Sequence, residues 1–264
     1  MSPVAAGVDI GSTTAKCAII ADGRIIFSPI VPTGANPTKA GEQALHEALS
    51  RLNSPVEEKY VVATGYGRVT APFADETVTE ITCHGRGAHY LDPRTRTVVD
   101  IGGQDSKAIA LGDDGRVVDF SLNDKCAAGT GRFLEFASRL VLDVQLEELG
   151  PISARSTSPA TISSTCTVFA LTEIVSLLAE GVSRENIVAG LHAAISQRVA
   201  AMVRRIGVRP TVMLTGGVAK NEGLRAALAR ELGVEVNPPS KADPQLVGAL
   251  GAAILAGERL ERKG

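Results

Sequence analysis

Two short stretches of the chain carry the same chemistry-bearing residues at the same spacing. One runs from Asp9 to Lys16 (DIGSTTAK) and the other from Asp100 to Lys107 (DIGGQDSK), so Asp, Ile, Gly and Lys recur at constant offsets. A polyphosphate needs backbone N–H groups that it can approach closely, hydroxyl donors and a cation, and the glycines of both stretches allow that approach. The repeated pattern therefore predicts two phosphate-binding loops.

The polar residues of these loops suggest separate roles. Asp9 and Asp100 end apolar runs, where a carboxylate can hold hydrated Mg²⁺, an ion that keeps several waters and uses few protein ligands. Gln104 or Asp105 could orient an attacking water, which makes these four residues the catalytic candidates. A later Gly-Gly pair predicts a third element, at which the backbone could approach a ribose or α-phosphate. The candidate nucleotide-binding residues are Gly11, Ser12, Thr13, Thr14, Lys16, Gly102, Gly103, Gly216, Gly217 and Lys220.

Other interpretations of these loops remain open. Each stretch taken alone also fits an ordinary tight hairpin, and Gly-Gly is a routine turn; the recurrence in a matching context favours phosphate binding. The chain contains neither GxxxxGK[ST] nor GxGxxG, and it has no GxSxG, so the familiar nucleotide fingerprints and a hydrolytic serine elbow are excluded.

Two of the four cysteines lie just before expected helices. Thiolates are stabilised near a helix N-terminus, which makes Cys126 and Cys166 candidate metal ligands. Neither belongs to a Cx₂C motif, and an iron–sulfur cube needs four thiolates, so a two-fold homodimer would have to supply them. From spacing alone, buried or inert cysteines remain the simpler interpretation. Cys17, and Cys83 beside His84, are expected to serve packing.

The elements that must position these residues alternate between strands and helices, which predicts the α/β class. Each loop stretch is followed by an Asp-Gly turn between apolar runs, a strong hairpin signal. The expected strands include 60–64 and 211–215, and the segment 151–164 is expected to be a loop. The expected helices are 37–52, 130–142, 167–180, one beginning after an N-cap at Ser183, 222–232 and 244–260.

Helical spacing also predicts which side chains of the two cysteine-linked helices face a core. In the first helix the expected inward residues are Phe133, Phe136, Ala137 and Leu140. In the second they are Val168, Leu171, Ile174, Val175 and Leu178.

Composition limits the possible partners. The 264 residues include 27 Lys and Arg against 29 Asp and Glu, a net charge of −2 that predicts no basic stripe for nucleic acid. Aromatic residues make up 3% and Trp is absent, which argues against base-stacking platforms. No apolar run reaches the ~18 residues of a membrane helix, and four cysteines make no disulfide framework, so a cytoplasmic location is expected.

The paired hairpin loops and the late Gly-Gly resemble the superfamily of acetate and sugar kinases, heat-shock chaperones and actin. That resemblance implies a two-lobed, actin-like ATPase fold with duplicated βββαβα-type lobes and ATP in the cleft between them. The expected N-terminal lobe is 1–95, joined by a closing helix 244–264, and the expected C-terminal lobe is 96–243, which carries both candidate cluster cysteines.

Seven motifs carry a closer resemblance, from Val8 to about Ala253. The segments VDIGSTTAK, ATGYGR, EITCHGRGA, DIGGQDSK, NDKCAAGTGRFLE, SSTCTVF and TGGVAKN are similar to the activator ATPases of 2-hydroxyacyl-CoA dehydratases. The same family includes the ATP-hydrolysing subunits of benzoyl-CoA reductase. One departure lies at Leu171 or Thr172, since the family pattern would place an additional acidic residue at one of these two positions.

The resemblance implies a redox activator. Cys126 and Cys166 match the two cysteines per subunit that hold one [4Fe–4S] cluster between the subunits of a homodimer. ATP, ADP and Mg²⁺ would be the other cofactors, with Mg²⁺ held through water by Asp9 and Asp100. Ferredoxin or flavodoxin would donate the electron, and a 2-hydroxyacyl-CoA dehydratase or benzoyl-CoA reductase-type enzyme would accept it.

Two further hypotheses stand beside this one. A small-molecule kinase of the same superfold would use Asp105 as a base toward a substrate hydroxyl and would need no iron. A nucleotide-gated assembly or chaperone-like module would need only the ATP site, although the chain has no evident peptide-binding domain.

Overall fold

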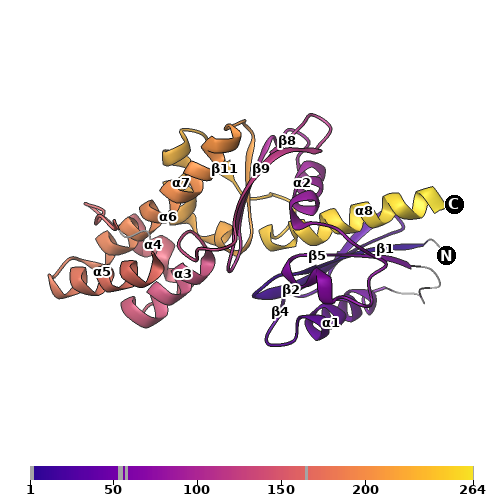
Figure 1. The fold of residues 1–264 in the computed structure, drawn as a ribbon, viewed down its shortest axis with the longest axis horizontal. Coiled ribbons are helices and arrows are strands. Elements are labelled where there is room, and N and C mark those ends of the chain that lie inside the picture. Colours follow the sequence, from indigo (N-terminus) through magenta and orange to yellow (C-terminus); the bar gives the residue numbers. More distant parts are fainter. Residues whose placement is uncertain (1–2, 53–55, 57–58, 164–165, 264) are drawn as a thin grey trace. The chain divides into compact units, whose positions relative to one another are not determined.

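The computed structural model describes residues 3–52, 56, 59–163 and 166–263, and the chain divides into two compact units. Figure 1 traces both. Unit 1 comprises Met1–Arg96, Leu111–Val118 and Pro239–Gly264. Unit 2 comprises Thr97–Ala110 and Asp119–Pro238. The C-terminal segment therefore returns to the N-terminal unit.

The sheet of unit 1 has the strand order β3-β2-β1-β5-β6, with β4 paired to β2. Its strands are β1 (Val4–Ile10), β2 (Thr14–Ala21), β3 (Arg24–Phe27), β4 (Val31–Pro32), β5 (Lys59–Thr64) and β6 (Glu76–Thr77). β1 runs antiparallel to β2 and parallel to β5. The turn between β2 and β3 is formed by Asp22 and Gly23, both at positive φ, as the Asp-Gly signal predicts.

Helices pack closely against this sheet. They are α1 (Pro37–Leu49), α2 (Glu80–Leu91) and α8 (Val247–Lys263), with α8 preceded by a 3₁₀ turn at Pro244–Leu246. A Cβ on Gly251 of α8 would lie 1.7 Å from the Cys83 carbonyl oxygen of α2, and one on Gly7 of β1 would lie 2.2 Å from the Ala249 carbonyl oxygen. Glycine is therefore required where α8 contacts the backbones of α2 and β1.

The sheet of unit 2 repeats the arrangement of unit 1. Its order is β11-β10-β7-β8-β9, where β7 runs antiparallel to β8 and parallel to β10. These strands are β7 (Thr97–Ile101), β8 (Ser106–Leu111), β9 (Val117–Asn123), β10 (Val212–Thr215) and β11 (Val236–Asn237). Because β7, β8 and β10 correspond to β1, β2 and β5, the internal duplication predicted from the sequence is confirmed.

Unit 2 also contains the longer helical part of the chain. Its helices are α3 (Gly131–Phe136), a π-helix (Ala137–Leu142), α4 (Leu149–Ala154), α5 (Thr167–Ala179), α6 (Arg184–Ile206) and α7 (Glu222–Leu232). As predicted, Ser183 caps α6, because its Oγ accepts a hydrogen bond from Asn186 N at 3.4 Å. None of the helices in the described residues combines the length and apolar character that crossing a bilayer would require.

Two local predictions were only partly confirmed. The segment 151–164 does not form a loop throughout, because α4 extends to Ala154. Pro151 lies in the first turn of α4, where its missing N–H is not needed, and a Gln145–Glu148 capping box begins the preceding 3₁₀ turn. The helix expected at 130–142 is α-helical only to Phe136 and continues as a π-helix.

The predicted core faces of α3 with the π-helix that continues it, and of α5, were also partly wrong. Phe133, Ala137 and Ile174 are buried as expected. In contrast, four residues predicted to face a core are exposed: Phe136 (39%), Leu140 (74%), Val168 (67%) and Val175 (53%). Helical periodicity identifies apolar positions, but it does not show whether the surface that covers them belongs to the same chain.

Candidate nucleotide and cysteine sites

The first candidate phosphate loop is the β1–β2 hairpin of unit 1. Gly11 N donates to Thr14 O at 3.0 Å and closes a tight turn. Asp9, which lies opposite Lys16 in the strand pair, is 5% exposed and accepts a hydrogen bond from Lys16 Nζ at 3.2 Å. The buried ammonium compensates the buried carboxylate, and it also donates to Thr14 O. Thr13 is exposed in the turn, and Ser12 and Thr14 are each partly exposed.

The β7–β8 hairpin of unit 2 has the same construction. Gly102 N donates to Asp105 O at 3.0 Å, and Lys107 Nζ lies 3.1 Å from Asp100 Oδ2. Lys107 Nζ also lies 2.6 Å from Asp105 Oδ2, so this lysine joins two of the predicted catalytic carboxylates. Gln104 is exposed at the tip of the turn, where a bound phosphate would be accessible to it.

Sequence reasoning missed a threonine beside each aspartate. Thr64 ends β5 opposite Asp9, and Thr215 ends β10 opposite Asp100. The Thr215 Oγ1 hydroxyl donates to Asp100 Oδ1 at 2.8 Å. The signal that would have revealed the pair is a repeated Thr-Gly dipeptide at the end of an apolar strand, in ATGYG and LTGGV.

A glycine follows each of these threonines. Gly216 is among the nucleotide-binding residues predicted from the sequence, but Gly65 is not. Both have φ of 85°, a left-handed backbone that favours glycine. A Cβ on Gly65 would lie 2.4 Å from Asp9 Oδ1, and one on Gly216 would lie 3.0 Å from Asp100 Oδ1. Each glycine thus lets the strand end approach an aspartate. Gly217 and Lys220 begin and end the 3₁₀ turn that follows Gly216.

The hairpin of unit 2 is hydrogen-bonded to the segment that carries Cys126. Gly131 N donates to Gly102 O and Arg132 N donates to Gly103 O, both at 2.9 Å. Ser106 Oγ donates to Gly129 O in the same segment. The first N–H groups of a helix lack intrahelical partners, and here the carbonyl oxygens of the predicted phosphate loop accept from them. Displacement of the hairpin would therefore act directly on α3.

The four cysteines differ in accessibility. Cys126 is half-buried in a loop that the side chain of Asn123 closes. Asn123 Oδ1 accepts a hydrogen bond from Cys126 N at 3.2 Å, and Asn123 Nδ2 donates to Cys126 O at 2.8 Å. Cys166 is exposed at the start of α5. Cys126 is separated from α3 by residues 127–130. Residues 164 and 165 of the SSTCTVF motif lie outside the described residues. Cys17 and Cys83 are buried, and burial raises the pKa of the Cys83 thiol to about 12. Only Cys126 and Cys166 are thus accessible as thiolate ligands.

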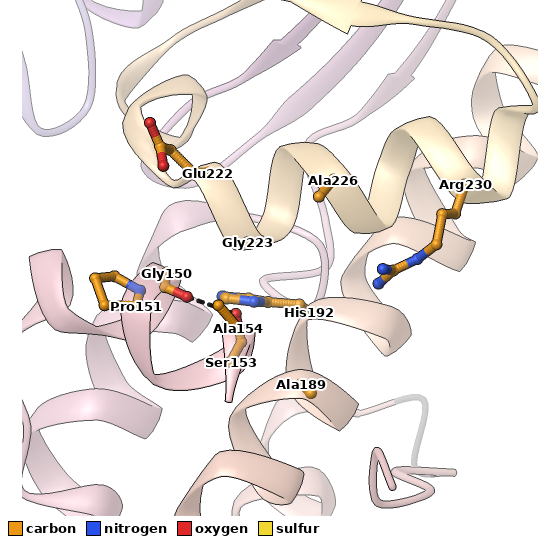
Figure 2. Close-up of a pocket in the computed structure, with 10 residues that line it drawn as sticks. All are labelled: Gly150, Pro151, Ser153, Ala154, Ala189, His192, Glu222, Gly223, Ala226 and Arg230. Carbon is orange, nitrogen blue, oxygen red and sulfur yellow. Dashed lines mark hydrogen bonds between the residues drawn. The ribbon is translucent and has the colours of Figure 1, made fainter. Parts of the chain in front are cut away.

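Unit 2 also contains a cavity of about 320 Å³ beneath α7 (Figure 2). α4, α6 and α7 line it, and its walls include Ala189 and Ala226. Its polar groups include Ser153, His192 and Arg230, and Figure 2 shows Arg230 extending from α7 toward His192. α7 directly follows the Gly216–Lys220 turn, so the cavity adjoins the third predicted nucleotide-binding element.

The hydrogen bonds around His192 determine its tautomer. Asn221 Oδ1 caps α7 by accepting from Leu224 N at 3.0 Å, so the Asn221 Nδ2 amide faces His192 Nε2, also at 3.0 Å. His192 Nε2 must then accept, and the proton of the neutral ring resides on Nδ1. Nδ1 has no hydrogen-bond partner within the described residues, so a buried N–H donor lies at the cavity wall. Burial, and secondarily the charge of Arg230, lowers the pKa of His192 to about 4.

This lowered pKa predicts a pH-dependent stability. Between pH ~6.5 and pH about 4, the unfolded chain binds a proton at His192 that the folded chain does not, so the free energy of unfolding falls as the pH falls. We expect the free energy of unfolding to fall by about 3 kcal/mol over that pH range because of His192. Urea unfolding of the wild type and His192→Gln should show the difference, with the exposed His46→Gln as control. Parallel pH profiles for the wild type and His192→Gln would contradict the prediction.

Comparison with known proteins identifies the family. Residues 6–256 match the model of the BadF/BadG/BcrA/BcrD ATPase family. The chain belongs to this family. The resemblance drawn from the sequence motifs is thereby confirmed.

The curated relatives include activators of dehydratases. The chain is 44% identical to the 2-hydroxyisocaproyl-CoA dehydratase activator of Clostridioides difficile over 95% of this chain and 93% of that protein. It is also 44% identical to the activator of lactoyl-CoA dehydratase of Anaerotignum propionicum, over 97% and 98% of the two chains. Among solved structures, the activator of the 2-hydroxyisocaproyl-CoA dehydratase from Clostridium difficile with bound ADPNP superposes with a TM-score of 0.90 at 43% identity, covering 98% of this chain and 96% of that chain.

A more distant likeness concerns the fold alone. The ROK hexokinase of Thermus thermophilus superposes with a TM-score of 0.55 at 15% identity, covering 98% of this chain and 99% of that chain. The actin-like ATPase fold inferred from the paired hairpins is therefore confirmed.

Proposed function

We propose that this ATPase-family chain is an electron-transfer activator. It uses ATP to deliver a low-potential electron from a [4Fe–4S] cluster to a 2-hydroxyacyl-CoA dehydratase or a benzoyl-CoA reductase-type enzyme. The observation that carries the proposal is the pair of hydrogen bonds from Gly131 and Arg132 to Gly102 and Gly103, which joins a predicted phosphate loop to a cysteine segment. The relatives named as dehydratase activators supply the acceptor class.

In this proposal the hairpins of both units act on nucleotide phosphates. Asp9 and Asp100 would hold Mg²⁺ through its water shell, and backbone N–H groups and hydroxyls of the turns would bind the phosphate oxygens. Gln104, exposed on its turn, orients the attacking water. Lys16 and Lys107 hold the two aspartates in their buried positions, so the lysines act mainly through the carboxylates.

The cysteines support a homodimer with one cluster. Cys126 and Cys166 are accessible thiols, and two copies of the chain would supply four, which fits the ligand set of a [4Fe–4S] cube. The exposed apolar residues Phe136, Leu140, Val168 and Val175 lie in the helical segments that follow the two cysteines in the chain, and they suit a surface that a second chain covers. When bound, the cluster supplies a one-electron carrier, which ferredoxin or flavodoxin would reduce.

The energetics are compatible with two nucleotides per dimer. For one electron, ~59 mV corresponds to about 1.4 kcal/mol, so lowering a potential by about 300 mV requires about 7 kcal/mol. A ligand can supply such energy only through a difference in affinity between two conformations. The hydrogen bonds between the Gly102–Gly103 turn and α3 would transmit a nucleotide-dependent movement of the turn to the segment of Cys126.

Purification without oxygen tests the proposal. The protein should be a brown dimer with about four iron and four sulfide per dimer, and it should hydrolyse ATP in the presence of Mg²⁺. With its acceptor enzyme and reduced ferredoxin, electron delivery should require ATP. A colourless, monomeric protein that cannot be reconstituted with iron would reject the proposal.

The cavity beneath α7 suggests where the nucleotide base binds. It offers alanine walls, a His192 N–H donor and a hydroxyl group, which suit a flat heterocycle with acceptor nitrogens. Ala226→Phe should fill the cavity and weaken ATP binding at least tenfold, because base contacts are lost, while leaving the affinity for tripolyphosphate unchanged. Calorimetry with both ligands measures the difference, and Ala201→Phe, at an exposed position of α6 outside the cavity lining, is the control. Equal losses for both ligands would contradict a base site.

The kinase alternative is less well supported by the geometry. The base it requires, Asp105, has its Oδ2 bound to Lys107 Nζ at 2.6 Å. A carboxylate held in this way is a better anchor for a loop than an acceptor for a substrate proton.

A further inference from the structure

The motif EITCHGRGA contains a histidine that the proposed function does not use. His84 lies in the first half of α2, is 5% exposed, and its Nδ1 lies 2.9 Å from Glu80 O. A carbonyl oxygen only accepts, so Nδ1 must be the donor of this bond, and the ring orientation is fixed along α2. Glu80 O thus satisfies one ring nitrogen of a polar side chain that is buried inside unit 1.

Gly248 shows where the ring points. A Cβ built on Gly248 would lie 2.9 Å from Asp9 Oδ2 and also 2.9 Å from His84 Cε1. The carboxylate from β1 and the imidazole from α2 therefore converge on the same point at the start of α8. Any side chain larger than glycine would displace one of them.

The two halves of the fold differ at this point. In unit 2 the strand-end hydroxyl of Thr215 donates to Asp100 at 2.8 Å. In unit 1 the corresponding Thr64 hydroxyl makes no such bond to Asp9 and instead lies beside the Cys83 thiol. Asp9 therefore lacks the hydroxyl donor that its counterpart has, and the imidazole of His84 lies on the side of Asp9 that faces Gly248.

We propose that His84 is a positioning residue for Asp9, orienting its carboxylate and the water shell of the Mg²⁺ that it holds. This inference rests on the proposed role of Asp9 toward Mg²⁺. Groups that orient a metal-binding side chain typically change metal affinity by ~10–100-fold when they are removed. A purely structural role, in which His84 only packs α2 against α8, would instead change nucleotide binding with and without Mg²⁺ to the same degree.

Equilibrium binding of ADP separates these roles. The Kd of ADP should be measured by calorimetry with Mg²⁺ and with EDTA for the wild type, His84→Gln and His89→Gln. His89 lies on the same helix, and its ring packs against Gly115 instead of Asp9. In His84→Gln we expect the increase in ADP affinity that Mg²⁺ produces to be ~10-fold smaller than in the wild type, while the ADP affinity in EDTA stays unchanged. His89→Gln should bind ADP like the wild type under both conditions.

Two further variants keep the test decisive. Gly248→Ala should give the same loss as His84→Gln, because the added Cβ separates the two groups, and thermal unfolding of each variant verifies that it is folded. Asp9→Asn should abolish the Mg²⁺ gain; if it does not, the proposed metal role of Asp9 fails. If Asp9→Asn abolishes the gain but folded His84→Gln retains all of it, the inference about His84 alone is overturned.

Discussion

A Cys126→Ser variant is expected to lose its brown chromophore and its iron while it still binds ATP. A serine hydroxyl is not a thiolate, so a homodimer that carries the substitution would offer only the two Cys166 thiols for a cluster that needs four ligands. Nucleotide binding should persist, because Asn123 closes the loop through the main chain of Cys126 and not through its side chain. Iron and sulfide analysis after anaerobic reconstitution, together with calorimetry for ATP, measures both effects.

The matched control is Cys17→Ala. Cys17 is fully buried in β2, and burial raises the pKa of its thiol, so it is unsuited to metal binding. Its substitution should leave the iron content of the protein unchanged, whereas Cys166→Ser should reproduce the loss seen with Cys126→Ser. Full iron content in Cys126→Ser would refute the assignment of that ligand.

Local signals explain most of what could be predicted about the fold. The Asp-Gly turn after β2 requires two residues at positive φ, and the sequence offers the residue types that tolerate it. Ser183 and Asn221 begin α6 and α7 by accepting hydrogen bonds from the first helical turns, and such caps depend only on neighbours in sequence. The duplication was visible because two complete hairpins recur in order.

The parts that escaped prediction depend on contacts distant in sequence. Thr64 and Gly65 become part of a site only because β5 pairs in parallel with β1, which places them opposite and against Asp9. Gly248 is similar, since its lack of a side chain matters only where β1 and α2 meet α8. The exposed faces of α3 and α5 were assigned to a core because hydrophobic spacing is the same for an internal core and for a surface covered by another chain.

An Asp100→Asn variant is expected to lose ATP hydrolysis by about a hundredfold or more, the typical effect of removing one preorganised electrostatic contact to the reacting groups. Asparagine keeps the shape of the side chain and an oxygen that can accept from Thr215 Oγ1. It removes the negative charge that would attract hydrated Mg²⁺. The ammonium of Lys107, which is 2% exposed, keeps the carboxylate of Asp105 as a partner. Steady-state hydrolysis with Mg²⁺ measures the loss.

Stability must be separated from catalysis in this variant, because removing one partner of a buried ion pair destabilises a protein by about 3–5 kcal/mol when the other charge is left uncompensated. Lys107 retains its 2.6 Å contact with Asp105, so Asp100→Asn should unfold at a somewhat lower temperature but remain folded under assay conditions. Exposed Asp119→Asn on β9 controls for loss of charge in the same unit. Because β1 and β7 are equivalent in the duplication, Asp9→Asn should lose hydrolysis to a similar extent. Undiminished hydrolysis in folded Asp100→Asn would show that this hairpin does not bind the nucleotide metal.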